Sequence, residues 1–239
     1  MSDWFEEWFG EEYLALYAHR DDADARAVAE LIHRRVRLPA GSPALDLASG
    51  AGRHARAFGA HWWTVGLDLS PALLRAARGA DHSAPLVRGD MRELPFRASS
   101  FTLVVNLFTS FGYFSDDSQH ERVVEEVGRV TRAGGVFVLD YLNASYVRDN
   151  LVAHDERRVG SRVVEQERSI SADGRYVCKT IRLSDEGRQF TERVRLFEPA
   201  ELVDMLDRCC FDLSEILGDH SGSPHSGRSP RTIMFAKRR

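Results

Sequence analysis

The sequence predicts an α/β protein with a doubly wound, mostly parallel seven-stranded sheet, an N-terminal helical cover and a small inserted antiparallel sheet. Three observations predict this arrangement. Short apolar segments alternate with helix-patterned segments over residues 40–142, as in βαβ units. Three segments within residues 157–197 alternate polar and apolar residues, as half-buried antiparallel strands do. Helix and strand patterns then return from residue 199 onward.

The N-terminal residues 1–38 are predicted to form the helical cover. A helical stretch begins near residue 4, and a second helix is expected over about residues 21–35, where apolar residues recur on one face. The segment Pro39–Pro43 then interrupts the helical pattern. The cover opens with a cluster of aromatic residues: Trp4, Phe5, Trp8 and Phe9.

The core is predicted from apolar runs and from helix signals between them. Ser70 and Pro71 are expected to open a helix, with Ser70 as N-cap and Pro71 at the first helical position. Another helix is expected over about residues 117–132, ended by Gly134-Gly135. The expected strands of this part are residues 44–48, 62–67, 85–88, 101–107 and 136–139.

The second half of the chain is predicted to insert a meander and then to complete the core. The meander strands are expected near residues 157–170, 175–184 and 188–197. A helix over residues 199–208 and strands at residues 211–217 and 232–236 follow. We therefore expect one domain, residues 1–239, with a core of residues 40–142 and 199–239 and an insertion of residues 143–198.

Composition narrows the class of protein. The chain has 239 residues and a mass of 27.0 kDa, with 43% hydrophobic and 28% charged residues, as in ordinary globular proteins. No apolar run approaches the ~18 residues of a membrane span. The net charge of −4 disfavours broad contacts with nucleic-acid phosphates. The N-terminal residues do not resemble a signal peptide. We expect a cytoplasmic protein with no membrane or nucleic-acid partner, either a monomer or a homodimer.

The cysteines and histidines predict neither a disulfide framework nor a metal site. Cys178 stands alone, and the adjacent residues Cys209 and Cys210 are poorly placed to bridge each other. This pair has no histidine at ligand spacing, and His220 and His225 lie in a polar loop. We therefore expect free thiols and no bound metal.

The first strand–loop–helix segment carries the strongest signal for a ligand site. The segment Gly50-Ala-Gly52-Arg-His-Ala55 matches the G-x-G-x-x-G/A pattern, in which glycines let the backbone approach a ligand at a helix N-terminus. Asp46 lies inside the first strand, and Asp68 and Asp90 end the second and third. Ligands bind at the carboxyl ends of strands in open α/β sheets, so these acids are expected to face one site. A tight turn and helix capping by Asp68 are the structural alternatives.

Taken together, these segments resemble the class I S-adenosylmethionine-dependent methyltransferases. Residues 101–107 and 131–140 extend the resemblance in the expected order, and the meander resembles the antiparallel lid of small bacterial members. The resemblance implies S-adenosylmethionine as cofactor and S-adenosylhomocysteine as product. The segments that carry it most directly are Leu45-Asp-Leu-Ala-Ser-Gly-Ala-Gly-Arg-His54, Val65-Gly-Leu-Asp-Leu-Ser-Pro71 and Gly89-Asp-Met-Arg-Glu-Leu-Pro-Phe96.

The family resemblance assigns roles at the cofactor. Asp46 and the glycine loop would hold the methionine moiety, Asp68 the ribose, and Asp90 the adenine amine. Ala48 departs from the family, because a glycine often stands there. The implied cofactor-binding set is Tyr13, Asp46, Ala48, Gly50, Gly52, Arg53, Asp68, Leu69, Asp90, Met91, Asn106 and Phe108.

Catalytic and acceptor residues follow less directly. A general base is needed only for an acceptor that arrives protonated. Tyr141, just past the fifth strand, is the best-placed candidate, and His54 and His220 are the others. Exposed salt bridges are the alternative explanation for Arg195 and Arg231, and packing with other aromatic residues is the alternative for Tyr17 and Phe111. The residues expected at the acceptor are Tyr17, Phe111, Tyr141, Arg195 and Arg231.

The predicted activity is methyl transfer to a nitrogen, oxygen or carbon of a small-molecule acceptor. Residues 106–109, Asn-Leu-Phe-Thr, lack the Asn/Asp-Pro-Pro-aromatic sequence of amino-methyltransferases acting on nucleobases or glutamine, and no Pro-Cys pair occurs there. An NAD(P)-dependent oxidoreductase is an alternative, because Asp68 follows Gly50 by roughly the 20 residues of the dinucleotide pattern. A cofactor-binding sensor without transfer activity is another.

Overall fold

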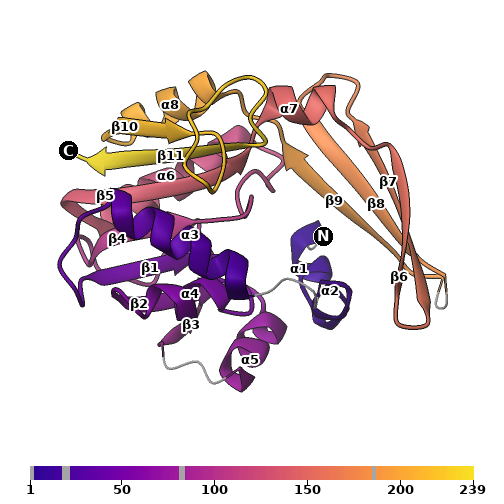
Figure 1. Ribbon diagram of the computed structural model, residues 1–239, viewed down its shortest axis with the longest axis horizontal. Helices are drawn as coiled ribbons and strands as arrows, with labels where there is room; N and C mark the ends of the chain where they lie inside the picture. Colours follow the sequence, from indigo (N-terminus) through magenta and orange to yellow (C-terminus); the bar gives the residue numbers. More distant parts are fainter. Residues whose placement is uncertain (1–2, 18–21, 81–83, 185–186) are drawn as a thin grey trace.

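The computed structural model describes residues 3–17, 22–80, 84–184 and 187–239 (Figure 1). A seven-stranded sheet forms its centre, in the order β10-β11-β5-β4-β1-β2-β3. The strands β1, β2, β3, β4 and β5 are parallel, and β11 is antiparallel to both neighbours. The bounds are β1 Pro43–Leu47, β2 Trp63–Asp68, β3 Leu86–Arg88, β4 Phe101–Asn106, β5 Thr131–Leu142, β10 Phe211–Leu217 and β11 Arg231–Arg238.

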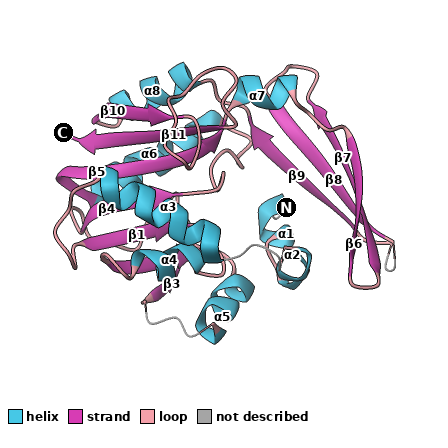
Figure 2. Cartoon of the chain, in the orientation of Figure 1, coloured by secondary structure: helices cyan, strands magenta, loops and turns pink. Residues whose placement is uncertain are grey.

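Helices cover both faces of this sheet, which confirms the doubly wound α/β prediction (Figure 2). α3 and α4 pack on one face, against Leu103 and Val105 of β4. α6 and α8 pack on the other face, against Leu45 and Leu47 of β1. The strand β1 is therefore buried on both faces, as a continuous apolar run requires. The bounds are α3 Asp22–Arg35, α4 Arg53–Phe58, α5 Pro71–Gly79, α6 Asp117–Val130, α7 Ala144–Asp149 and α8 Pro199–Arg208.

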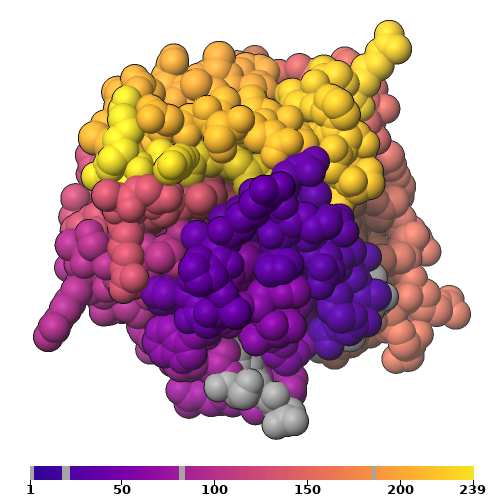
Figure 3. All heavy atoms as spheres, turned by 60° about the vertical axis from the view of Figure 1, so that its left-hand side comes forward, coloured from indigo at the N-terminus to yellow at the C-terminus, as the bar shows by residue number. Residues whose placement is uncertain are grey.

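A separate antiparallel sheet forms the lid, which we define as the four strands β6 to β9 in sequence order. Their bounds are β6 His154–Val159, β7 Arg162–Ile170, β8 Tyr176–Leu183 and β9 Gln189–Arg195. Two short helices, α1 Trp4–Trp8 and α2 Glu11–Leu16, lie between the lid and the main sheet (Figure 1). Figure 3 shows the N-terminal residues, in indigo, packed between the yellow C-terminal segments and the salmon lid.

Three predicted element bounds are wrong. The stretch expected as one strand over residues 157–170 is a hairpin of β6 and β7, turned at Gly160 with φ of 62°. The first cover helix is interrupted at Phe9 and Gly10. The helix expected to end at Gly134-Gly135 ends at Val130 instead, and the two glycines lie in β5 at a register irregularity against β4. Gly134 has a φ of 74°, which explains the glycine there.

The N-cap of α5 is confirmed. The Ser70 side chain accepts a hydrogen bond from the Leu73 backbone N–H at 3.2 Å, and Pro71 opens the helix. None of the helices among the described residues is long and apolar enough to span a membrane.

Candidate active site

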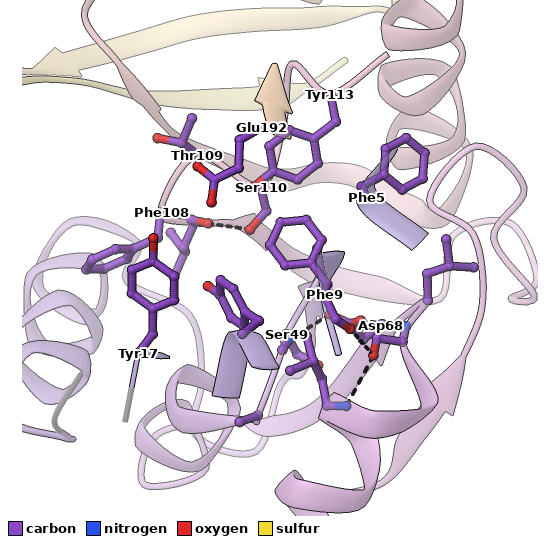
Figure 4. Close-up of a pocket in the computed structure, with 18 of the residues that line it drawn as sticks. Phe5, Phe9, Tyr17, Ser49, Asp68, Phe108, Thr109, Ser110, Tyr113 and Glu192 are labelled. Atoms are coloured by element: carbon purple, nitrogen blue, oxygen red, sulfur yellow. Dashed lines mark hydrogen bonds between the residues drawn. The ribbon is translucent and has the colours of Figure 1, made fainter. Parts of the chain in front are cut away.

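A central cavity of about 910 Å³ opens at the carboxyl ends of β1, β2 and β4 (Figure 4). It is bounded by the main sheet below, by α1 and α2 on one side, and by the inner face of the lid above. The volume lies near the upper end of the range for ligand pockets, which is about 300–1,000 Å³. The cavity therefore has room for a nucleoside-sized cofactor and a second small molecule.

The glycine loop after β1 forms one wall of the cavity. Ala48, Gly50 and Gly52 all have left-handed φ values, of 60°, 57° and 74°. Such a conformation is uncommon for alanine, so the loop holds Ala48 in a strained backbone geometry. A Cβ at Gly50 would meet no atom within 4 Å, which leaves its backbone open to a ligand.

Asp46 lies beneath this loop with a carboxylate that the protein does not fully satisfy. Its side chain is 1% exposed, and no described residue hydrogen-bonds its Oδ2 atom. Burial and, to a smaller extent, the charge of the nearby Asp68 carboxylate raise the pKa of Asp46 to about 7. A cationic ligand group at Oδ2 would supply the missing partner.

Asp68 connects the glycine loop to the start of α5. Its Oδ2 accepts from the Gly50 N–H and its Oδ1 from the Ser70 N–H, each at 2.8 Å. Burial raises the pKa of Asp68, and these backbone donors oppose the rise. The Ser70 hydroxyl also donates to the Phe9 carbonyl at 2.5 Å. The carboxylate at the end of β2 thus stands where the N-terminal cover meets the sheet.

Asp90 follows the end of β3 by two residues and is paired with Arg92. The Arg92 guanidinium donates to its carboxylate, at 2.6 Å from Nη2 and 3.0 Å from Nε. Burial by itself would raise the pKa of Asp90, but the hydrogen bonds and charge of Arg92 outweigh it and the pKa is lowered. Asp90 and Met91 both line the cavity.

The loop after β4 forms the opposite wall and is held by a buried carboxylate. Phe108 and Thr109 have φ values of 55° and 62°. The Phe108 N–H donates to Asp140 Oδ2 at 3.1 Å, and Asp140 also contacts His220 at 3.0 Å and Arg231 at 2.7 Å. Burial opposes ionisation of Asp140, but these partners lower its pKa to about 2. The strained loop is therefore fixed by a charged network.

Most of the predicted cofactor residues lie together in this cavity. The acceptor-side prediction Tyr17 and the candidate base His54 also line it. The ring of His54 packs against Phe108, with centroids 5.1 Å apart. The cofactor-set residues that line the cavity are Tyr13, Asp46, Ala48, Gly50, Arg53, Asp68, Leu69, Asp90, Met91 and Phe108.

Two residues of the predicted cofactor set, Gly52 and Asn106, lie outside the cavity lining. Gly52 is the N-cap of α4 and stands outside the described lining. Asn106 is 1% exposed, and its Nδ2 donates to the Leu47 carbonyl at 3.0 Å, tying β4 to β1. These residues support the cavity walls, and their direct contact with a cofactor stays a prediction.

The structure speaks against Tyr141 as a general base. Its side chain is fully buried, and its hydroxyl donates to the Arg195 carbonyl. Burial raises the pKa of Tyr141 far above its usual range, which opposes loss of the phenol proton. Tyr141 packs with Phe111 and Phe197 on the α6–α8 side of the sheet, away from the cavity. Its hydroxyl joins β5 to the end of the lid.

Three further residues predicted at the acceptor also lie outside the cavity lining: Phe111, Arg195 and Arg231. Phe111 is 1% exposed and belongs to the core. Arg195 pairs with Asp117 at 3.2 Å and with Glu201 at 2.8 Å. Arg231 is bound to Asp140. These arginines therefore neutralise carboxylates of the protein itself.

Several residues that line the cavity were not among the predicted site residues. Phe9 belongs to the N-terminal aromatic cluster, and Tyr113 to the aromatic run after the fourth strand, for which the sequence allows either core packing or an apolar wall at the substrate. Others come from the lid, where alternation assigns a face to each side chain without saying what that face covers. The lid residues that line the cavity are Asp155, Arg157, Gln166, Arg168, Lys179, Glu192 and Val194.

Comparison with known proteins decides the family. A family profile described as a methyltransferase domain matches residues 44–135. The dTDP-3-amino-3,4,6-trideoxy-alpha-D-glucopyranose N,N-dimethyltransferase of Streptomyces venezuelae is 32% identical over 190 residues, which cover 75% of this chain and 78% of that enzyme. This chain belongs to the class I S-adenosylmethionine-dependent methyltransferases. The oxidoreductase and sensor alternatives are thereby set aside.

Solved structures of methyltransferases share the whole architecture. The sugar N-methyltransferase KedS8 from Streptoalloteichus sp ATCC 53650 has a TM-score of 0.73 and 26% identity, covering 96% of this chain and 94% of that chain. The CcbJ methyltransferase from Streptomyces caelestis has a TM-score of 0.82 at 20% identity and covers 99% of both chains, which shows a common fold. The similarity includes the lid as well as the main sheet.

The cavity of this methyltransferase fits S-adenosylmethionine, its cofactor. The cofactor supplies a methyl group on a sulfonium, a good leaving group, so the protein mainly has to position the acceptor. The unsatisfied oxygen of Asp46 suits the cationic amino group of the methionine moiety. Asp68, at the end of the neighbouring strand, suits the ribose hydroxyls. Both carboxylates favour a cofactor that carries positive charge.

Proposed function

We propose that this methyltransferase transfers its methyl group to an amine nitrogen of a small, sugar-like acceptor. The observation that carries the proposal is the aromatic chamber, by which we mean the part of the central cavity walled by Phe9, Tyr13, Tyr17, Phe108 and Tyr113. The rings pack closely, with centroids 4.9 Å apart for Phe9 and Tyr13 and 4.8 Å apart for Tyr13 and Tyr17. Aromatic faces bind ammonium groups and apolar surfaces of ligands.

The proton balance of the transfer step also favours nitrogen over oxygen. A hydroxyl acceptor must lose its proton as it attacks, and a positioned base supports that step. Of the three candidate bases, Tyr141 is buried outside the cavity and His220 is bound to Asp140, whereas His54 lines the cavity with its ring against Phe108. A neutral amine carries its own lone pair and needs no base to attack. Methylation of a neutral amine nitrogen therefore requires no catalytic base from the protein.

Two relatives support the same class of acceptor. The Streptomyces venezuelae relative is named for N,N-dimethylation of a dTDP-linked amino sugar. KedS8 is described as a sugar N-methyltransferase. A small molecule also agrees with the net charge of −4, which disfavours a nucleic-acid acceptor.

An acceptor comparison tests the proposal. The purified enzyme is incubated with S-adenosylmethionine and either dTDP-3-amino-3,4,6-trideoxyglucose or its 3-hydroxy counterpart. Mass spectrometry follows S-adenosylhomocysteine release and a gain of one or two methyl groups on the acceptor. We expect methylation of the amino sugar alone. Methylation of the hydroxy counterpart at a similar rate would contradict the proposal, as would turnover with none of a panel of free and nucleotide-linked amino sugars.

A further inference from the structure

A row of charged side chains crosses the inner face of the lid. Arg168 of β7 lies opposite Lys179 of β8, which lies opposite Glu192 of β9. All three line the central cavity. On β8 and β9 the residues on either side of the row are apolar, Val177 and Val194 at one end and Ile181 and Phe190 at the other, whereas Gln166 of β7 and Asp155 of β6 are polar. Arg168 is paired within the lid, with Asp155 at 2.5 Å and with Gln166 at 2.6 Å. Lys179 and Glu192 are the charges of the row that contact the N-terminal cover, at Tyr17 and Trp8.

The carboxylate of Glu192 is held in a fixed orientation. Its Oε1 accepts from the Trp8 indole N–H at 2.7 Å, and its Oε2 lies 3.5 Å from Lys179 Nζ. Trp8 is 1% exposed and packs on Phe190, with ring centroids 4.7 Å apart. The Glu192 side chain keeps 21% of its surface exposed, toward the cavity that it lines. A carboxylate anchored by a buried indole therefore faces the space beneath the lid.

Glu192 lies on the side of the cavity away from Asp68. In Figure 4 its side chain appears in the same part of the cavity as Thr109 and Ser110, and Lys179 links it to Tyr17. Asp68 lies on the other side of the same cavity, close to Ser49. The sheet thus contributes carboxylates on one side of the cavity. The lid contributes two, Glu192 and Asp155, of which Asp155 is paired with Arg168 at 2.5 Å.

Lys179 positions Glu192 without occupying all of its oxygen lone pairs. The Lys179 ammonium donates to the Tyr17 hydroxyl at 2.5 Å, and its distance to Glu192 is the longer of the two. Burial lowers the pKa of Lys179, and the positive charges of Arg168 and Arg157 lower it further against the opposing effect of Glu192. Each carboxylate oxygen can accept two hydrogen bonds, so Glu192 retains capacity for a ligand donor.

We propose that Glu192 accepts a hydrogen bond from the acceptor amine and stabilises the positive charge that develops on its nitrogen. This inference rests on the proposed function, in which the acceptor atom is nitrogen. The amine lone pair forms the N–C bond while the C–S bond breaks and its electrons stay on sulfur. The positive charge passes from sulfur to nitrogen, and no proton moves in that step. The new ammonium then loses a proton to water before or after release.

Glu192 is therefore a catalytic residue in the electrostatic sense. The carboxylate orients the N–H bonds, which aims the lone pair at the methyl group. Its charge is fixed in place before the reaction, on the side where positive charge appears. The N-terminal cover takes part through Trp8, which fixes the carboxylate. A neutral hydroxyl acceptor would gain far less from this arrangement.

A binding experiment tests the charge at Glu192 without requiring the acceptor. The probe is sinefungin, an S-adenosylmethionine analogue in which a carbon bearing an amine replaces the methylated sulfur. Its ammonium should lie within reach of Glu192, whereas S-adenosylhomocysteine has no group there. By calorimetry, we expect Glu192→Gln to weaken sinefungin at least fivefold and S-adenosylhomocysteine less than twofold. Glutamine keeps an oxygen for the Trp8 indole, and thermal unfolding checks the fold.

Glu167→Gln is the matched control, because it makes the same change on the outer face of the lid, opposite His154 in register. It should leave both affinities unchanged. Equal weakening of sinefungin and S-adenosylhomocysteine in Glu192→Gln would overturn the inference, because the residue would then act on the cofactor site as a whole. An unchanged sinefungin affinity would overturn it as well.

A kinetic experiment tests the acceptor step itself. With dTDP-3-amino-3,4,6-trideoxyglucose as probe, kcat/KM for the acceptor should fall 10- to 100-fold in Glu192→Gln, as expected for loss of a charge-assisted contact. The affinity for S-adenosylmethionine should stay within twofold. An unchanged kcat/KM would overturn the inference. If the wild type methylates no amine while Glu192→Gln still loses sinefungin selectivity, the amine acceptor is wrong and the placement of Glu192 at the methyl group stands.

Discussion

Asp46 lies inside β1 and Asp68 ends the neighbouring parallel strand β2, and the charge of Asp68 adds to burial in raising the pKa of Asp46 to about 7. Below pH 7, most Asp46 carboxyls in the free enzyme are therefore protonated. A cationic cofactor group favours the ionised form, so binding must release this proton. We expect affinity for S-adenosylmethionine to rise with pH up to about 7 and to level off above it, by at most about tenfold per pH unit.

Calorimetry in buffers of different ionisation enthalpy measures this proton release. We expect close to one proton released at pH 6 and a smaller number at pH 8. Asp46→Asn is the control, because it cannot release a proton, and its binding should be weaker at pH 8. Equal proton release by the wild type and Asp46→Asn at pH 6 would rule out Asp46 as the source.

Asp68→Ala is expected to weaken cofactor binding by about 1–3 kcal/mol, or roughly 5- to 150-fold. The substitution removes the proposed ribose ligand and also the acceptor for the Gly50 and Ser70 N–H groups. Asp68→Asn retains one side-chain oxygen, so its cofactor affinity should lie between those of the wild type and Asp68→Ala. The dissociation constant from calorimetry checks this, and a value equal to that of the wild type would remove Asp68 from the ribose site.

Tyr141→Phe is expected to reduce stability and to leave the chemistry intact. The hydroxyl donates to the Arg195 carbonyl inside the core, so its loss should cost about 1–2 kcal/mol of unfolding free energy. Methyl transfer should change less than about threefold, because Tyr141 lies outside the cavity. Urea unfolding and kcat at saturating substrates separate the two effects. A hundredfold loss of kcat with normal stability would restore Tyr141 as a catalytic candidate.

His120 makes the free energy of unfolding depend on pH in the acid range. Burial lowers its pKa from 6.5 to about 4, although Asp117 opposes the shift. Between these values the unfolded chain binds a proton that the folded chain does not, so stability decreases as pH falls from 6.5 to 4. The loss from this residue is at most about 3 kcal/mol. His120→Gln can still accept from the Phe114 N–H and should flatten that part of the profile. An identical slope in both proteins would exclude His120.

The core strands and the cofactor acids could be predicted because two independent signals coincide there. Parallel strands buried on both faces appear as continuous apolar runs, and ligand-binding acids follow at their carboxyl ends. Asp46, Asp68 and Asp90 carry both signals, and the structure places all three at one cavity.

The same burial explains the error at Tyr141. Successive side chains of a strand point to opposite faces, and a strand that is apolar on both faces does not reveal which face holds the site. Asp140 faces the Phe108 loop, so Tyr141 faces the α6–α8 core. The sequence predicts where the strand ends, but it does not show which of these two residues faces the site.

The sequence predicts the lid as an antiparallel sheet but not the number of its strands. Gly160-Ser161 is a two-residue turn signal, and it separates β6 from β7. Glu192 could not be identified in this way, because its role depends on Trp8, which lies 184 residues earlier in the chain. Alternation assigns Glu192 to a face, and only the tertiary fold shows that this face lies over the cavity.

The N-terminal cover contacts both sides of the central cavity. The Phe9 carbonyl accepts a hydrogen bond from the Ser70 hydroxyl, and the Trp8 indole donates one to Glu192. A single segment therefore closes the cofactor pocket and completes the acceptor pocket. From this shared wall we expect an ordered mechanism, in which the cofactor binds before the acceptor. Product inhibition should then follow an ordered pattern, with S-adenosylhomocysteine competing against S-adenosylmethionine and not against the acceptor. A second methylation of the same nitrogen would require the segment to open and close again.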